Sequence, residues 1–117
     1  PGLLSSGSGF DVGIGLEDAC DARVYHNTIV STGGLFAGVD LRFGNTVGGA
    51  ITNNFSTHRI VVRDGASSTA SGANAWSAPA SSFRSLAGDG DLRLLPSASQ
   101  AIDAGGNIPT VTDDIDG

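Results

Sequence analysis

Two segments, VYHNTIV (residues 24–30) and AITNNFS (residues 50–56), determine the fold that this sequence predicts. Each places asparagine between short apolar runs, as expected for strands separated by tight turns. Aligning Asn27 with Asn53 keeps the spacing from asparagine to the next apolar residue, and we prefer this register. The alternative register aligns Asn27 with Asn54, one residue further on. In either register, asparagine recurs at a turn.

The residues beside this asparagine are also predicted to be structural. His26 falls opposite Thr52, which has no acid–base capacity, so His26 is expected to be a residue of the repeat and not a catalytic group. Ile29 and Phe55, two residues beyond the aligned asparagines, are expected to return to the core. Asparagine tolerates left-handed backbone, and stacked asparagine amides can hydrogen-bond between repeats.

A second motif recurs at a similar distance. GIGL (residues 13–16) returns as GVDL (residues 38–41) and, in part, as IVVR (residues 60–63). The period of two in a strand points alternate aliphatic side chains to one face. Gly13 and Gly38 are expected to mark turns that enter the strands. The predicted inward residues are Ile14, Leu16, Val39, Leu41, Ile60 and Val62.

A repeat of about 20 to 27 residues made of strands and turns predicts a solenoid. The 18 glycines among 117 residues fit short strands and many turns. Helical repeats are longer, and a leucine-rich repeat needs a leucine ladder that is missing here. The sequence therefore predicts an all-β fold, a right-handed parallel β-helix of about three to four coils with an irregular C-terminal cap.

The predicted chain has three parts. Residues 1–12 form an N-terminal segment or cap, residues 13–82 the β-helix coils, and residues 83–117 a C-terminal strand and capping tail. Within the coils, residues 64–82 are small and polar and read as an irregular last coil or a loop, with Trp76 as its large anchor. The apolar residues available to the N-terminal cap are Leu3, Leu4 and Phe10.

The tail carries the more specific pattern. DLRLLPSASQAIDAG (residues 91–105) is followed by TDDIDG (residues 112–117). Together with the asparagine repeat, it resembles the pectate-lyase-like right-handed parallel β-helix proteins, in particular the C-terminal coils and cap of secreted bacterial members. Gln100 stands where that family usually has proline. The resemblance covers residues 13–117 and implies an extracellular or cell-surface location, carbohydrate-active relatives and further coils on the N-terminal side.

Charge and composition argue against several function classes. The net charge is −6, and all six basic residues are arginine. An acidic chain repels nucleic-acid phosphates and anionic membranes, so neither is an expected partner, and no run is long enough for membrane insertion. Cys20 is the only cysteine, which excludes an internal disulfide. The first residues lack the basic and apolar regions of a signal peptide.

The alternation of the second motif predicts a charged outward face. Glu17, Arg42 and Arg63 follow the inward residues and are expected to form one column, with Asp40 in the column beside it. In the resembled family such a face holds the sugar groove, so these four residues are candidate ligand-binding residues, and Trp76 is a candidate stacking platform. The alternative is a salt-bridge ladder, in which two stacked arginines need an anion between them.

A lyase that abstracts a proton from a uronate needs a base and often calcium. No lysine is present, which leaves Arg42 and Arg63 as weak candidate bases. Glu17, Asp18 and Asp21 could supply some calcium ligands, but their segment reads equally well as a polar turn. We therefore predict no metal site and no required cofactor, with calcium as a lesser alternative.

The leading functional expectation is a non-catalytic β-helical module that binds glycan, such as an acidic polysaccharide, or acts in structure and assembly. One alternative is a polysaccharide lyase, or its C-terminal fragment, acting on a uronate polymer. Another is a structural or adhesive oligomer that stacks through coil edges. The first coil presents strand edges that missing N-terminal coils, the N-terminal cap or a partner subunit would have to cover.

Overall fold

The computed structural model describes residues 11–86 and 90–112, and this part of the chain is mostly β, as predicted. The predicted N-terminal cap residues Leu3, Leu4 and Phe10, and the terminal DDIDG, lie outside the described residues. No helix in the described part is long and apolar enough to cross a membrane. The elements are β1 (Val12–Glu17), β2 (Arg23–Tyr25), β3 (Thr28–Ile29), β4 (Ala37–Arg42), β5 (Gly49–Thr52), β6 (Phe55–Ser56), β7 (Ile60–Val62), β8 (Ser68–Gly72), the 3-10 turn η1 (Ala80–Ser82), β9 (Phe83–Ser85) and β10 (Asp91–Leu94).

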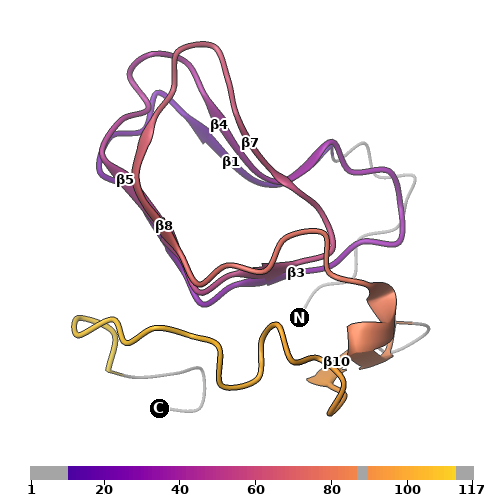
Figure 1. The fold of residues 1–117 in the computed structure, drawn as a ribbon. Coiled ribbons are helices and arrows are strands. Elements are labelled where there is room, and N and C mark those ends of the chain that lie inside the picture. Colours follow the sequence, from indigo (N-terminus) through magenta and orange to yellow (C-terminus); the bar gives the residue numbers. More distant parts are fainter. Residues whose placement is uncertain (1–10, 87–89, 113–117) are drawn as a thin grey trace.

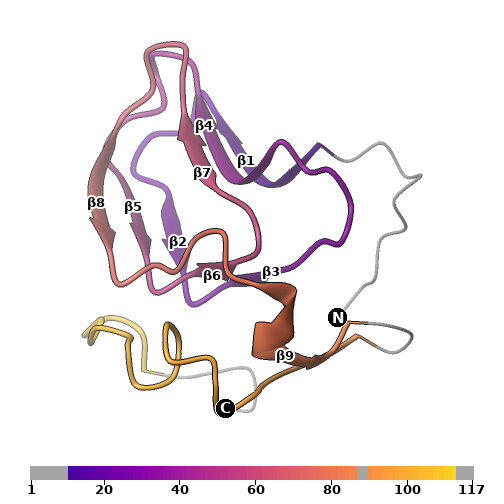
Figure 2. The ribbon, with the colours of Figure 1, turned by 45° about the vertical axis from the view of Figure 1, so that its right-hand side comes forward.

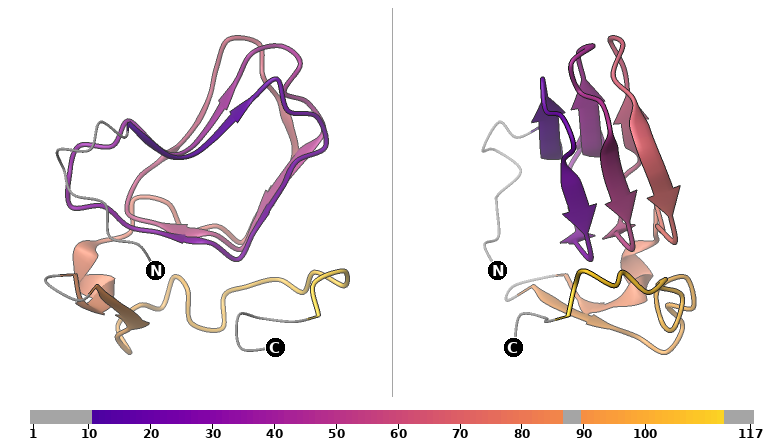
Figure 3. Two further views of the ribbon diagram at one scale, coloured as in Figure 1. Left: turned by 180° about the vertical axis from the view of Figure 1, so that it is seen from behind. Right: turned by 90° about the vertical axis from the view of Figure 1, so that its left-hand side faces the viewer.

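The strands form three small parallel sheets, ordered β1-β4-β7, β2-β5-β8 and β3-β6, and one antiparallel pair, β9 with β10. The chain visits the three parallel sheets in turn and then returns to the first. We call each such passage a circuit. The three circuits contain β1 to β3, β4 to β6, and β7 with β8, and they lie one behind another (Figures 1 and 3).

The first sheet aligns the segments that the second sequence motif predicted. Ile14 pairs with Val39, and Leu41 pairs with Val62. Val39 and Leu41 are fully buried, and Ile14 packs against them in the main core. The register predicted for these three segments is confirmed, because large aliphatic residues at alternate positions leave one face that can be buried.

The glycines of that motif do not mark turns. Gly13 lies inside β1 and Gly38 inside β4. A Cβ atom at Gly13 would stand 2.5 Å from Ile29 Cγ2, and one at Gly38 would meet the hydroxyl of Ser56. Both positions therefore require glycine for close approach between neighbouring segments and not for a left-handed turn.

Val62 also departs from the prediction, since it is 47% exposed. Its pairing with buried Leu41 puts it on the inward face, as its register predicts. However, β7 is the last strand of its sheet, so no further described strand covers this side chain.

The asparagine repeat forms a hydrogen-bonded ladder, but in the register that we did not prefer. Asn27 donates its backbone N–H and its Nδ2 to Asn54 Oδ1, both at 3.0 Å. Asn54 in turn donates its N–H and its Nδ2 to Asn74 Oδ1, at 2.9 and 3.0 Å. The preferred alignment of Asn27 with Asn53 is wrong, and Asn74 adds a third member that the sequence pattern did not single out.

The residue before each ladder asparagine adopts left-handed backbone. The φ values are 53° at His26, 59° at Asn53 and 50° at Ala73. His26 therefore corresponds to Asn53 and not to Thr52, which pairs with Tyr25. Asparagine adopts this conformation more readily than most residues, which suits Asn53 to its position before the ladder member Asn54.

A second apolar cluster joins β6 of the third sheet to the segment that follows β8 and to β9. Phe55, Ala75, Ala78 and Phe83 are buried together, and the Phe55 and Phe83 ring centroids are 5.4 Å apart. Phe55 is buried as predicted, but it pairs with exposed Thr28 rather than with Ile29, so it faces away from the main core. The C-terminal tail runs beneath the third sheet and covers this cluster (Figure 2).

Asn53 attaches the tail to the second circuit. Its Nδ2 donates to the carbonyl of Gly106 at 2.6 Å, and its Oδ1 accepts from the Gly106 N–H at 2.9 Å. These two bonds fix the orientation of the amide, so the Nε2 atom of His26, 3.3 Å from Asn53 Nδ2, lies on its donor side. The two bonds to Gly106 hold the tail against the second circuit at Asn53.

The segment expected to be an irregular last coil or a loop contains the strand β8, whose pairing with β5 shifts in register between Gly49 and Ala50. β8 pairs with β5 through Ala70 with Ala50 and Gly72 with Thr52. The sequence did not indicate this strand, because STASG offers no large aliphatic residue to mark an inward face. Its place is set by backbone pairing along an existing strand.

The ladder predicts a large cost for removing Asn54, whose side chain is among the largest that are fully buried. Asn54→Ala removes the side-chain hydrogen bonds to Asn27 and Val24 in the first circuit and to Asn74 in the third, while the bond from its backbone N–H to Asn74 remains. We expect a loss of about 3 kcal/mol in the free energy of unfolding. Urea denaturation measures this change. Asn45→Ala, at an exposed turn, is the matched control and should cost less than about 0.5 kcal/mol. Equal effects of the two substitutions would contradict a structural role for the ladder.

The hairpin of β9 and β10 predicts a pH effect. Hydrogen bonds from the side chain and N–H of Arg93 lower the pKa of Asp91 from 3.8 to about 2. A lowered pKa in the folded state gives stability that is present above pH 3.8 and is lost as the pH falls to about 2. Asp91→Asn should therefore lower Tm by about 2 °C at pH 6 and by less at pH 2, as measured by circular dichroism. Asp103→Asn is the control, and the difference in Tm between this variant and the wild type should be the same at pH 6 and pH 2.

Candidate functional site

The outward side of the β1-β4-β7 sheet gathers four of the five predicted ligand-binding residues. Glu17 and Arg42 are paired across β1 and β4, Asp40 projects beside them, and Arg63 follows β7. Asp64, the next residue, completes the group. We call these five residues the charged face. They lie on β1 and β4 or follow β7, and these three strands lie side by side in Figure 1.

Asp40 and Arg63 form the most buried ion pair of the charged face. Arg63 Nε donates to Asp40 Oδ1 at 3.0 Å, and Arg63 Nη2 donates to Oδ2 at 2.8 Å. Asp40 is only 3% exposed. These hydrogen bonds raise the pKa of Arg63, which keeps its guanidinium group protonated.

Asp64 joins the two arginines. Its Oδ2 accepts from Arg42 Nε at 2.8 Å and lies 3.5 Å from Arg63 Nη1. Glu17 is further away, with its Oε1 3.8 Å from Arg42 Nη1. The anion needed between two stacked arginines is thus a carboxylate of the chain itself. The sequence pattern missed it because alternation points the residue after Arg63 inward, whereas the left-handed backbone of Asp64, with a φ of 53°, breaks the alternation there.

Aromatic rings flank the charged face. The guanidinium carbon of Arg42 lies 4.4 Å from the ring centroid of Phe43. Those of Arg59 and Arg63 lie 5.2 and 5.3 Å from the ring centroid of Phe36. Cation–π contacts at these distances restrict the motion of the arginine side chains. The strand pattern does not mark these rings, because Phe36 and Phe43 lie just before and just after β4.

Trp76 lies apart from this group. It follows Ala75, which bridges to the second circuit at Phe55, and its partly buried side chain packs against the main core. This contact matches the anchoring role that the sequence suggested for the segment. The structure does not bring Trp76 together with the arginines.

The candidate calcium ligands occupy a turn. Asp18 and Asp21 have left-handed backbone, with φ values of 50° and 54°. In the described part of the chain, no three His, Cys, Asp or Glu side chains are grouped closely enough to hold a metal ion. Asp21 instead belongs to a backbone turn, and its N–H donates to the carbonyl of Val47 at 2.8 Å.

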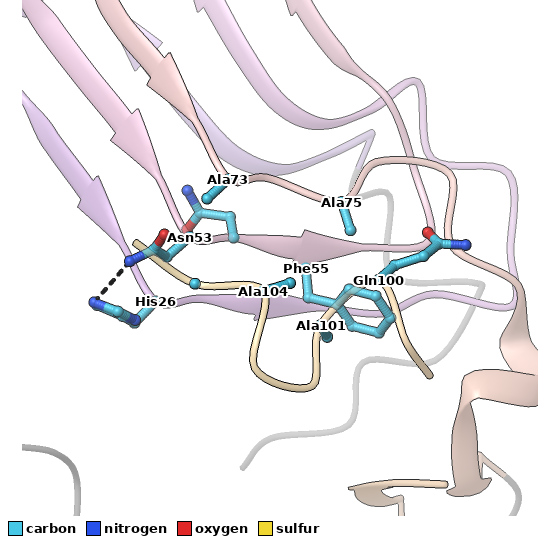
Figure 4. A pocket seen from close by; sticks show the side chains of 10 residues that line it. His26, Asn53, Phe55, Ala73, Ala75, Gln100, Ala101 and Ala104 are labelled. Carbon is cyan, nitrogen blue, oxygen red and sulfur yellow. Dashed lines mark hydrogen bonds between the residues drawn. The ribbon is translucent and has the colours of Figure 1, made fainter. Parts of the chain in front are cut away.

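A small cavity lies between the third sheet and the tail (Figure 4). Its volume is about 110 Å³, and His26 and Asn53 line one end while Phe55, Gln100 and Ala101 line the other. Pockets for small molecules usually have roughly 300 to 1,000 Å³. The cavity is therefore smaller than a typical ligand site, and we interpret it as space left between the sheet and the tail that packs against it.

No family model, no curated protein and no solved structure matches this chain. A function can therefore be proposed only from the geometry of the charged face and from the resemblance of the sequence motifs to the pectate-lyase-like β-helix proteins.

The burial of Asp40 predicts which arginine matters more for stability. Arg63→Ala leaves a buried carboxylate without its ion-pair partner, whereas Arg42→Ala affects only half-exposed groups. We expect Tm to fall by roughly 5 °C in Arg63→Ala and by about 1 °C in Arg42→Ala. The first value is kept moderate because a third of the Arg63 side chain is exposed, so water weakens the ion pair. Thermal unfolding measures both changes.

Adding Asp40→Asn to Arg63→Ala is the internal test of this mechanism. The second substitution removes the unpaired charge and should recover part of the lost Tm. A double variant less stable than Arg63→Ala would contradict the interpretation.

Proposed function

We propose that the chain is a right-handed parallel β-helix module that binds a uronate-containing polysaccharide on its charged face, without catalysis. The observed basis of the proposed fold is the set of stacked parallel sheets. Three circuits, an internal aliphatic core and an asparagine ladder are the features expected of such a solenoid. An extracellular or cell-surface location, which the resemblance implies, belongs to the same proposal.

The observation that supports the binding role most is the placement of the arginines. Arg42 and Arg63 come from successive circuits and stand side by side, joined by a single carboxylate. Guanidinium groups bind carboxylates through paired, charge-assisted hydrogen bonds. A sheet built from paired strands keeps the donors at a fixed spacing, so a polymer with regularly spaced carboxylates suits this face.

The state of the arginines favours binding over proton abstraction. A catalytic base must be able to lose its proton near the working pH. Arg63 donates hydrogen bonds to both carboxylate oxygens of Asp40, and its pKa is raised, so it is poorly suited to act as a base. Arg42 is likewise engaged by Asp64. We therefore propose these arginines as binding residues and not as the base of a lyase.

Affinity gel electrophoresis tests the proposal. We expect migration to be retarded by polygalacturonate and not by neutral galactan. Arg42→Ala should weaken the retention about fivefold, because one charge-assisted contact is lost. Arg42 is preferred to Arg63 for this test because its removal leaves Asp40 paired.

Arg84→Ala is the matched control. Arg84 belongs to β9, on the hairpin and not on the charged face, and its side chain is 62% exposed. Its removal makes the same change in net charge and should leave retention unchanged. Equal losses in the two variants would point to non-specific charge attraction, and no retention by any acidic polysaccharide would refute the proposed function.

A further inference from the structure

We propose, on the basis of the glycan-binding function above, that Asp64 is a displaceable counter-ion. It occupies the place of the ligand carboxylate between Arg42 and Arg63, and the ligand must replace it to bind. Asp64 would then set both the affinity and the selectivity of the charged face.

The position of Asp64 reproduces that of a bound uronate group. Asp64 Oδ2 is 2.8 Å from Arg42 Nε and 3.5 Å from Arg63 Nη1. A uronate carboxylate offers the same acceptor atoms and the same charge to these two donors. Asp64 and the ligand carboxylate therefore compete for one position.

Asp64 and Asp40 differ in how easily they can leave. Asp40 is buried, and both of its oxygens accept hydrogen bonds from Arg63. The Asp64 side chain is 45% exposed, and the residue follows β7 beside Gly65 at a turn. Exposed ion pairs are weak because water solvates the separated charges well. Asp64 can thus be exchanged for a ligand carboxylate, whereas Asp40 remains as a fixed support.

The arginines have supports that do not depend on Asp64. Arg63 stays bonded to Asp40 and lies near the Phe36 ring. Arg42 stays over the Phe43 ring. Removing Asp64 should therefore leave two ordered donors with an open position between them, and preorganised donors bind with a smaller entropic loss.

Two consequences follow for recognition. Because Asp64 is tethered beside the arginines, it competes at a high effective concentration, and the wild-type chain should bind a uronate polymer only weakly. A methyl ester carries no charge and accepts only weaker hydrogen bonds from the two arginines, so an esterified polymer of the same backbone should bind less well whether or not Asp64 is present.

Affinity gel electrophoresis of Asp64→Asn tests the inference, with polygalacturonate and its methyl-esterified form as probes. Asparagine tolerates the left-handed backbone at this position, where φ is 53°, so the variant should fold. We expect retention by polygalacturonate to become about fivefold tighter and retention by the esterified polymer to stay unchanged.

Asp18→Asn is the matched control. Asp18 follows Glu17, which pairs with Arg42, so it stands at the same corner of the first circuit, with a φ of 50°. This control makes the same change in net charge but leaves the ion pairs of the two arginines with Glu17, Asp40 and Asp64 in place, so it should leave retention nearly unchanged. An equal gain in both variants would reflect net charge alone and would overturn the inference.

The remaining outcomes separate this inference from the proposed function. If the wild-type chain is retained by polygalacturonate but Asp64→Asn is not retained more tightly, Asp64 is not a competing group, and glycan binding still stands. If neither protein is retained, both the inference and the proposed function fail. Asp64→Gly, which also suits a left-handed turn, should behave as Asp64→Asn does if the displaced carboxylate is the cause.

Discussion

One buried amide, that of Asn54, connects all three circuits. Its Nδ2 donates to the carbonyl of Val24 in the first circuit and to Asn74 in the third, while its Oδ1 accepts from Asn27. A buried amide must have its hydrogen bonds satisfied, so this contact permits only one alignment of the circuits at this corner. The circuits differ in length, with 27 residues between the first two ladder members and 20 between the last two. The loops between the strands account for this difference in length.

The charged face depends on this alignment. Arg42 and Arg63 come from different circuits, and their spacing is that of neighbouring parallel strands. Asp40 and Asp64 then pair with them, one buried and one half-exposed. The two arginines therefore have one buried carboxylate partner in the sheet, Asp40, and two more exposed partners, Glu17 and Asp64. Such an arrangement favours exchange of carboxylates over chemistry at the arginines.

The sequence predicted the parts of the structure that large aliphatic residues mark. Alternation in GIGL, GVDL and IVVR predicted the first sheet, its register and the outward placement of Glu17, Arg42 and Arg63. It could not predict β8, Asn74 or Asp64, because their segment is small and polar and its strand forms by pairing with β5. It also could not choose between Asn53 and Asn54. Both suit the corner, and only the carbonyls around Asn54 decide which one enters the ladder.

The ladder can be tested most directly by amide hydrogen exchange, measured by NMR on the unmodified chain. The N–H groups of Asn27 and Asn54 donate to asparagine side chains of the next circuit. If the ladder aligns the circuits, both should exchange as slowly as the N–H of Leu41 in the core, through global unfolding. Exchange as fast as that of Asn45, at an exposed turn, would contradict the central role of the ladder.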